Sequence, residues 1–132
     1  MSKDDVFPFD RAVARRYTQG RIVRVVNNEG LLTGGLVGSL GVVYATFKDD
    51  SAPELGIPFG GFAVLFEHGL VEGFSLEQAA WWLEPTAAVD PRLVNYHFEG
   101  LESLLKMFTQ GYFKQTFELG RRPFGVVPGG IQ

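Results

Sequence analysis

The two histidines are the side chains of this sequence best suited to acid–base chemistry, because imidazole ordinarily titrates close to neutral pH. His68 directly follows Glu67, and His97 lies two residues before Glu99. Such a set could bind a divalent metal ion if folding brought it together, yet neither pair has the spacing of a recognised ligand motif. We therefore interpret His68 as a turn residue and His97 as a helix residue, and we predict no metal site, no cofactor and no catalytic residue. A small enzyme that uses His68 or His97 is kept as an alternative.

A second feature that could do chemistry is the glycine-rich stretch from residue 30 to residue 41. Four of its glycines, Gly34, Gly35, Gly38 and Gly41, are spaced as closely as those of phosphate-binding loops. A phosphate-binding loop also needs a helix start and usually a Lys-Ser or Lys-Thr pair, and neither follows here. None of the serines has the sequence setting of a hydrolase nucleophile. We therefore interpret the glycines as corners between strands.

Basic and aromatic residues near the N-terminus could contact a nucleic-acid backbone and stack on a base. The residues concerned are Arg15, Arg16, Tyr17, Arg21 and Arg24. The charge of the whole chain argues against this use, because the net charge is −3 and residues 27–105 hold eleven acidic residues but only two basic ones. Modules that bind nucleic acid usually show a clear basic excess. Nucleic-acid binding is therefore an alternative and not the first prediction.

Aromatic residues in the second half of the chain point to a protein partner. Trp81 and Trp82 are adjacent, and neighbouring side chains on a helix point about 100° apart, so the two indoles cannot enter one pocket. Either one of them is exposed or the C-terminal helix covers both. Large aromatic side chains at a surface often anchor protein contacts. The predicted partner-binding residues are Trp81, Trp82, Phe108, Tyr112 and Phe113.

The elements that would position these residues follow from periodicity. Apolar residues recur with a period of two over residues 21–26 and 40–48, and residues 62–67 form an apolar run, and both patterns are typical of strands. Ser75 and the Asp90-Pro91 pair are helix-start signals. The sequence predicts a single α+β domain, with an N-terminal helix over 10–19, a β-barrel over 20–74, helices over 75–118 and an irregular tail over 119–132.

Composition agrees with a compact β structure inside the cell. The 132 residues include 12 Phe and 17 Gly, which supply buried area and tight turns, and no Cys, which excludes disulfides and thiol chemistry. No apolar run has the length of a membrane span, and the N-terminus lacks the apolar core of a signal peptide. We therefore predict a cytoplasmic protein that does not contact membranes.

The sequence resembles a small SH3-like barrel of the KOW type in three segments, which are residues 20–26, 35–44 and 62–67. In that family a G-x-x-V-x-V strand is followed by a glycine-containing turn and further short strands that close the sheet. The resemblance covers roughly residues 18–84. It implies a small SH3-like antiparallel β-barrel, here with a short N-terminal helix and a C-terminal helical extension. Such barrels bind RNA, DNA, peptides or partner subunits, so the resemblance implies a binding module.

These observations favour a non-enzymatic binding module that acts through protein–protein contacts. The partner would be a second copy of the chain or another protein, and the module could serve as a small inhibitor or as an accessory protein of a mobile element. A nucleic-acid-binding small barrel and a small histidine-dependent enzyme are the alternatives.

Overall fold

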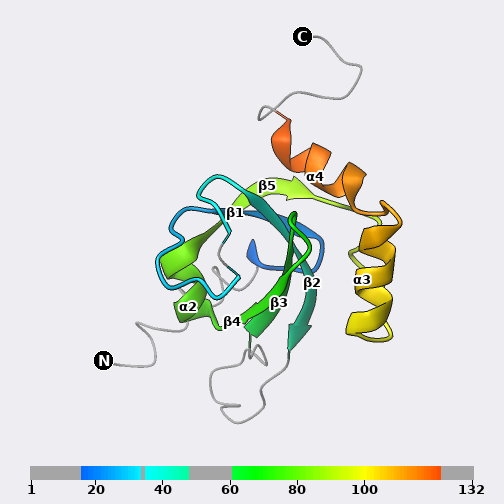
Figure 1. Cartoon of the computed structure of the whole chain (residues 1–132), viewed down its shortest axis with the longest axis horizontal. Coiled ribbons are helices and arrows are strands. Elements are labelled where there is room, and N and C mark those ends of the chain that lie inside the picture. The colour runs from blue at the N-terminus through cyan, green and yellow to red at the C-terminus, as the bar shows by residue number, and fades with distance from the viewer. Residues whose placement is uncertain (1–15, 34, 48–60, 123–132) are drawn as a thin grey trace.

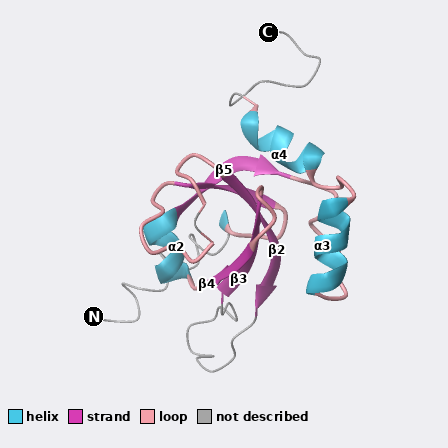
Figure 2. Cartoon of the chain, in the orientation of Figure 1, coloured by secondary structure: helices cyan, strands magenta, loops and turns pink. Residues whose placement is uncertain are grey.

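The computed structural model describes residues 16–33, 35–47 and 61–122 of the chain. In these ranges the chain forms five strands and three helices (Figures 1 and 2). The strands are β1 (Arg21–Val25), β2 (Leu40–Phe47), β3 (Gly61–Phe66), β4 (Val71–Phe74) and β5 (Leu83–Val89), and the helices are α2 (Leu76–Trp82), α3 (Leu101–Thr109) and α4 (Lys114–Arg121). The predicted α+β class is therefore confirmed.

The five strands form one antiparallel sheet in the order β4-β3-β2-β1-β5. β4 and β5 are its edges, so the sheet is open, and the prediction of a closed barrel over residues 20–74 is wrong. Closure would require β4 to pair with β5. β4 has only four residues and pairs with β3 alone, while β5 pairs with β1 alone.

Both faces of the sheet are buried. Along β3 the side chains alternate between two apolar clusters: Phe62, Val64 and Phe66 belong to the first, and Leu65 belongs to the second. The first cluster lies on the side of α2, and the second lies beneath α3 and α4 (Figure 2). This arrangement explains the nearly continuous apolar run of β3, since a strand covered on both faces has no polar side. The alternation predicted for β1 is confirmed, with Val23 facing the first cluster and Ile22 the second.

The C-terminal half differs from the prediction at three places. Residues 83–89 lie in the range predicted to hold helices but form strand β5, and the helix whose predicted start signal is Asp90-Pro91 begins only at Leu101. Asp90 instead starts a turn: its carboxylate accepts a hydrogen bond from the backbone N–H of Arg92, and its carbonyl accepts one from Leu93. Helix α4 also runs to Arg121, inside the predicted irregular tail. Residues 123–132 of that tail, and residues 10–15 of the predicted N-terminal helix, lie outside the described residues.

The Asp90 side chain fastens the C-terminal helices to the sheet. Its Oδ2 accepts hydrogen bonds from Thr116 Oγ1 at 2.6 Å and from Arg92 Nη2 at 2.9 Å. Arg92 Nη2 also lies 3.1 Å from the carbonyl oxygen of Tyr112, and its guanidinium lies 4.4 Å from the centre of the Tyr112 ring. Only 1% of Asp90 is exposed. One buried carboxylate at the end of β5 therefore fixes the start of α4.

No helix in the described ranges is long and apolar enough to cross a membrane.

Candidate functional site

Exposed apolar side chains identify two separate regions of the surface. Ten large apolar residues of the described ranges are exposed. Six of them lie on the β1–β2 loop, the β3–β4 turn and the end of α2: Val26, Leu32, Leu36, Val37, Leu70 and Trp81. The strand register places these three segments at the same end of the sheet, because Val25 is paired with Leu83 and Gly41 with Phe66. We call these six residues the hairpin-end surface.

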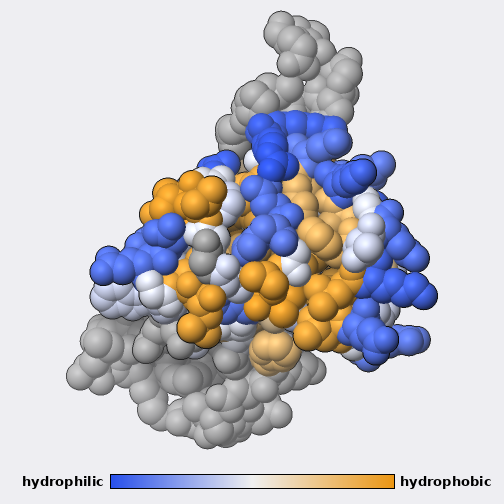
Figure 3. All heavy atoms as spheres, viewed as in Figure 1, coloured by the Kyte–Doolittle hydropathy of each residue, from blue (hydrophilic) through white to orange (hydrophobic). Residues whose placement is uncertain are grey.

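Figure 3 shows apolar atoms in orange on the side of the molecule that carries the β1–β2 loop and α2. Leu32 is 89% exposed, Leu36 74% and Val37 60%. Scattered single apolar residues are normal at a protein surface, but a group of them at one end of a sheet is typical of a contact site. The sequence indicated this region only through Trp81. The pairs Leu31-Leu32 and Leu36-Val37, apolar residues within a glycine-rich turn, were the signal that could have found the rest.

The β1–β2 loop is held in place by side chains from the β3–β4 hairpin. The Glu72 carboxylate accepts hydrogen bonds from the backbone N–H groups of Leu32, at 3.3 Å, and Thr33, at 3.0 Å. His68 Nε2 lies 3.2 Å from the carbonyl oxygen of Thr33. Since a carbonyl only accepts, the imidazole donates this bond through Nε2. The loop is thus anchored beside its most exposed apolar residue.

The two tryptophans have different environments, which agrees with the first of the two predicted alternatives, that one of them is exposed. Trp82 packs against the first apolar cluster, and its Nε1 donates a 2.8 Å hydrogen bond to the carbonyl oxygen of Glu29. The carbonyl oxygen of Trp82 accepts the backbone N–H of Val26 at 2.8 Å. Trp81 is 69% exposed. Trp82 therefore supports the β1–β2 loop, and Trp81 presents its indole to solvent beside it.

The other three predicted partner-binding residues lie elsewhere. Phe108, Tyr112 and Phe113 belong to the second apolar cluster, on the side of α3 and α4. Phe113 is only 1% exposed, so its assignment to a contact surface is wrong: the side chain is part of the core. Phe108 and Tyr112 are half-buried. The sequence could not distinguish these aromatic residues from Trp81, because an excess of aromatic residues does not tell which of them are buried and which are exposed.

The aromatic residue proposed for nucleic-acid stacking is also in the core. Tyr17 is buried and stacks on Phe62, with ring centres 4.4 Å apart and planes inclined by 12°. Burial raises the pKa of its hydroxyl above the ordinary value. Tyr17 therefore has no free ring face for a base. Arg16 is exposed, and Arg15 lies outside the described residues.

The two arginines of β1 already have partners within the fold. Arg21 Nη1 donates a 3.2 Å hydrogen bond to the carbonyl oxygen of Thr86, while its Nε is buried with no hydrogen-bond partner among the described residues. Arg24 Nη1 lies 3.6 Å from a carboxylate oxygen of Glu84. Both guanidinium groups are aimed at β5 rather than grouped on a free basic surface. The described part of this basic cluster therefore gives nucleic acid little to bind.

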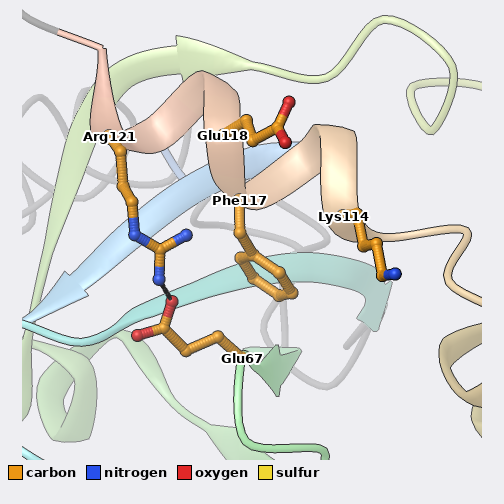
Figure 4. A pocket seen from close by; sticks show the side chains of 5 residues that line it. All are labelled: Glu67, Lys114, Phe117, Glu118 and Arg121. Carbon is orange, nitrogen blue, oxygen red and sulfur yellow. Dashed lines mark hydrogen bonds and ion pairs between the residues drawn. The ribbon is translucent and has the colours of Figure 1, made fainter.

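A shallow groove of about 320 Å³ runs beside α4 and is shown in Figure 4. Arg121 reaches from α4 to the carboxylate of Glu67 and pairs with it beside the ring of Phe117. Lys114 and Glu118 lie along the same helix, and in Figure 4 the Glu118 carboxylate points away from Glu67. Because the inward-facing charges neutralise each other, the groove has no net charge to select an ionic ligand.

The structure keeps the two histidines apart. His68 lies on the turn after β3, at the hairpin end, whereas His97 lines a hollow beside the far end of β2. No three His, Asp, Glu or Cys side chains of the described ranges come close enough together to hold a metal ion. His97 was predicted to be a helix residue, but it lies in the irregular segment before α3. A reaction that uses both histidines is therefore geometrically excluded.

No family model, no curated protein and no solved structure matches this chain. The resemblance to KOW-type barrels consequently stays a prediction from three short sequence segments.

Proposed function

We propose that the protein is a non-enzymatic binding module that acts through protein–protein contacts made by the hairpin-end surface. The observation that carries the proposal is the exposure of Leu32, Leu36 and Val37 on a loop whose backbone is bonded to Glu72. Burying a large apolar side chain gains about 1.5 to 3 kcal/mol. Leaving several of them in water at one end of the sheet is therefore costly unless a partner covers them.

The anchoring of the loop supports the same proposal. A loop that is already ordered loses less conformational entropy when a partner binds, so more of the contact energy appears as affinity. Trp82 helps to order the loop through its hydrogen bond to the carbonyl oxygen of Glu29. Trp81 adds a large exposed ring of the kind that anchors protein contacts. A small inhibitor or accessory protein would act through a preformed surface of this kind.

The test is a double substitution in the exposed loop, Leu36→Asp with Val37→Asp. Both side chains are exposed, so the fold should be kept, but two carboxylates in an apolar contact should lower partner capture from native lysate at least about tenfold, which corresponds to 1.4 kcal/mol. The matched control is Leu101→Asp, which changes an exposed leucine at the first residue of α3, where an acidic residue suits the helix N-terminus.

Circular dichroism verifies that both variants fold, and light scattering on a sizing column detects self-association as one form of partner. The proposal predicts proteins, or a second copy of the chain, that associate with the wild type and the control but not with the double variant. Equal capture by all three would contradict it.

A further inference from the structure

The four remaining exposed apolar residues, Phe47, Val94, Tyr96 and Leu101, mark a second region, near the far end of β2. Three of them line a hollow of about 340 Å³ between β2 and the segment that leads into α3. Four aromatic residues contribute to its wall: Tyr44, Phe47, Tyr96 and Phe98. No other hollow described here has so many rings. It is distinct from the hairpin-end surface and plays no part in the function proposed above.

The rings of this hollow are held at steep angles to one another. The Tyr44 and Phe98 rings are nearly perpendicular, at 89°, with centres 6.2 Å apart. The Tyr96 ring is tilted by 51° against Phe98, with centres 4.6 Å apart. Gln19 holds the backbone of this wall, because its side-chain amide donates hydrogen bonds to the carbonyl oxygens of Leu93, at 2.6 Å, and Tyr96. Aromatic side chains therefore line a hollow whose backbone is already held in place by hydrogen bonds.

The surroundings of the hollow are acidic, although its wall is not. No Lys, Arg, Asp or Glu occurs among the described residues that line it. Glu99 lies between two lining residues, and Glu102 directly follows another. Both carboxylates are exposed and form no ion pair with any described residue. The polar side chains of Gln19, Thr46 and His97 also line the wall, so a ligand in the hollow meets rings and polar groups, with two exposed carboxylates at the border.

We infer that this aromatic hollow binds an alkylated ammonium group. Ring faces attract cations through the ring quadrupole, and the attraction grows when water is excluded. A primary ammonium or a guanidinium carries several N–H donors, and the described wall has no carboxylate that would pair with such a group directly. A fully alkylated ammonium has no N–H group. It suits a site that offers rings nearby and carboxylates only at its border.

The site is tested by titrating the full chain with tetramethylammonium and following the backbone amide resonances by NMR. The resonances of residues 44–47 and 96–101 should shift. Tert-butanol serves as the neutral counterpart of similar size, and ammonium as the cation with N–H donors. Tetramethylammonium should bind at least about tenfold more tightly than either, as a cation–π attraction of about 1.4 kcal/mol would give. Equal affinity for tert-butanol would overturn the inference, because the hollow would then be merely apolar.

Substitutions locate the binding. Phe47→Leu keeps an apolar side chain at an exposed position but removes a ring, and it should weaken tetramethylammonium binding at least about threefold. Glu99→Gln should weaken binding and reduce its dependence on salt, because a carboxylate of the border is lost. Val94→Ser, an exposed apolar residue outside the hollow, should leave binding unchanged. Shifts confined to other residues, or no shifts with any probe, would also overturn the inference.

Discussion

Asp90 carries its charge where water hardly reaches it. Burial alone would raise the pKa of this carboxyl, but the hydrogen bonds from Arg92 and Thr116 outweigh burial and lower the pKa below its ordinary value. The folded protein therefore holds the ionised form more strongly than the unfolded chain does. The stability that results is complete above the unfolded pKa of about 4 and disappears as the pH falls through the lower folded pKa.

Replacing Asp90 with Asn tests this residue. The amide keeps the shape but loses the charge that Arg92 and Thr116 recognise, so the free energy of unfolding at neutral pH should fall by about 2 kcal/mol. The loss should shrink as the pH is lowered below about 4, because the carboxyl of the unfolded wild-type chain is then protonated while that of the folded protein still resists protonation. Urea unfolding over a range of pH measures both effects. A constant difference between the two proteins at every pH would contradict the assigned role of the charge.

At the scale of the element, Gly120 determines how closely α4 approaches the sheet. A methyl group at this position would lie 2.7 Å from Ile22 Cγ2 and 2.8 Å from Leu40 Cδ1. Gly120 is buried, and Ile22 belongs to a strand and is branched at Cβ, so it has little freedom to move away. The helix therefore packs on β1 and β2 through a residue without a side chain.

Gly120→Ala should destabilise the protein although alanine is the better helix former. Alanine gains about 1 kcal/mol of helix propensity, while overpacking costs about 1 to 3 kcal/mol, so we expect a net loss of about 1 kcal/mol. Gly100→Ala is the matched control, because nothing lies within 4 Å of a methyl group there and the backbone is extended. Thermal unfolding compares the two variants. A Gly120→Ala protein as stable as the control would show that α4 does not pack as described.

The elements also show how far the sequence predicts the fold. The sequence predicted β1 to β3 because these strands are rich in apolar side chains, which pack into the cluster on one face of the sheet or the other. Strand β5 was missed because Pro85, Ala87 and Ala88 are poor strand formers; its place at the edge of the sheet tolerates the proline. Its pairing with β1 is a tertiary effect that local propensity does not contain.

At the scale of the whole molecule, the sheet has an apolar layer on each face and one end with exposed apolar side chains. The five strands were consistent with either a closed or an open sheet, because closure depends on the contact between β4 and β5 and not on any one segment. The candidate site could be predicted only in part for a similar reason. Trp81 is conspicuous in the sequence, whereas Leu32 and Leu36 become informative only when the fold places them beside it.

The central claim is that a protein partner covers the hairpin-end surface, and amide hydrogen exchange tests it most directly. Exchange is measured for the free protein and for the complex recovered from native lysate, or for the self-associated form. We predict slower exchange on binding in residues 26–39, 67–70 and 79–83, with α3 and α4 unchanged. Slower exchange confined to α3 and α4, or to residues 16–24, would contradict the account and move the binding site to another part of the molecule.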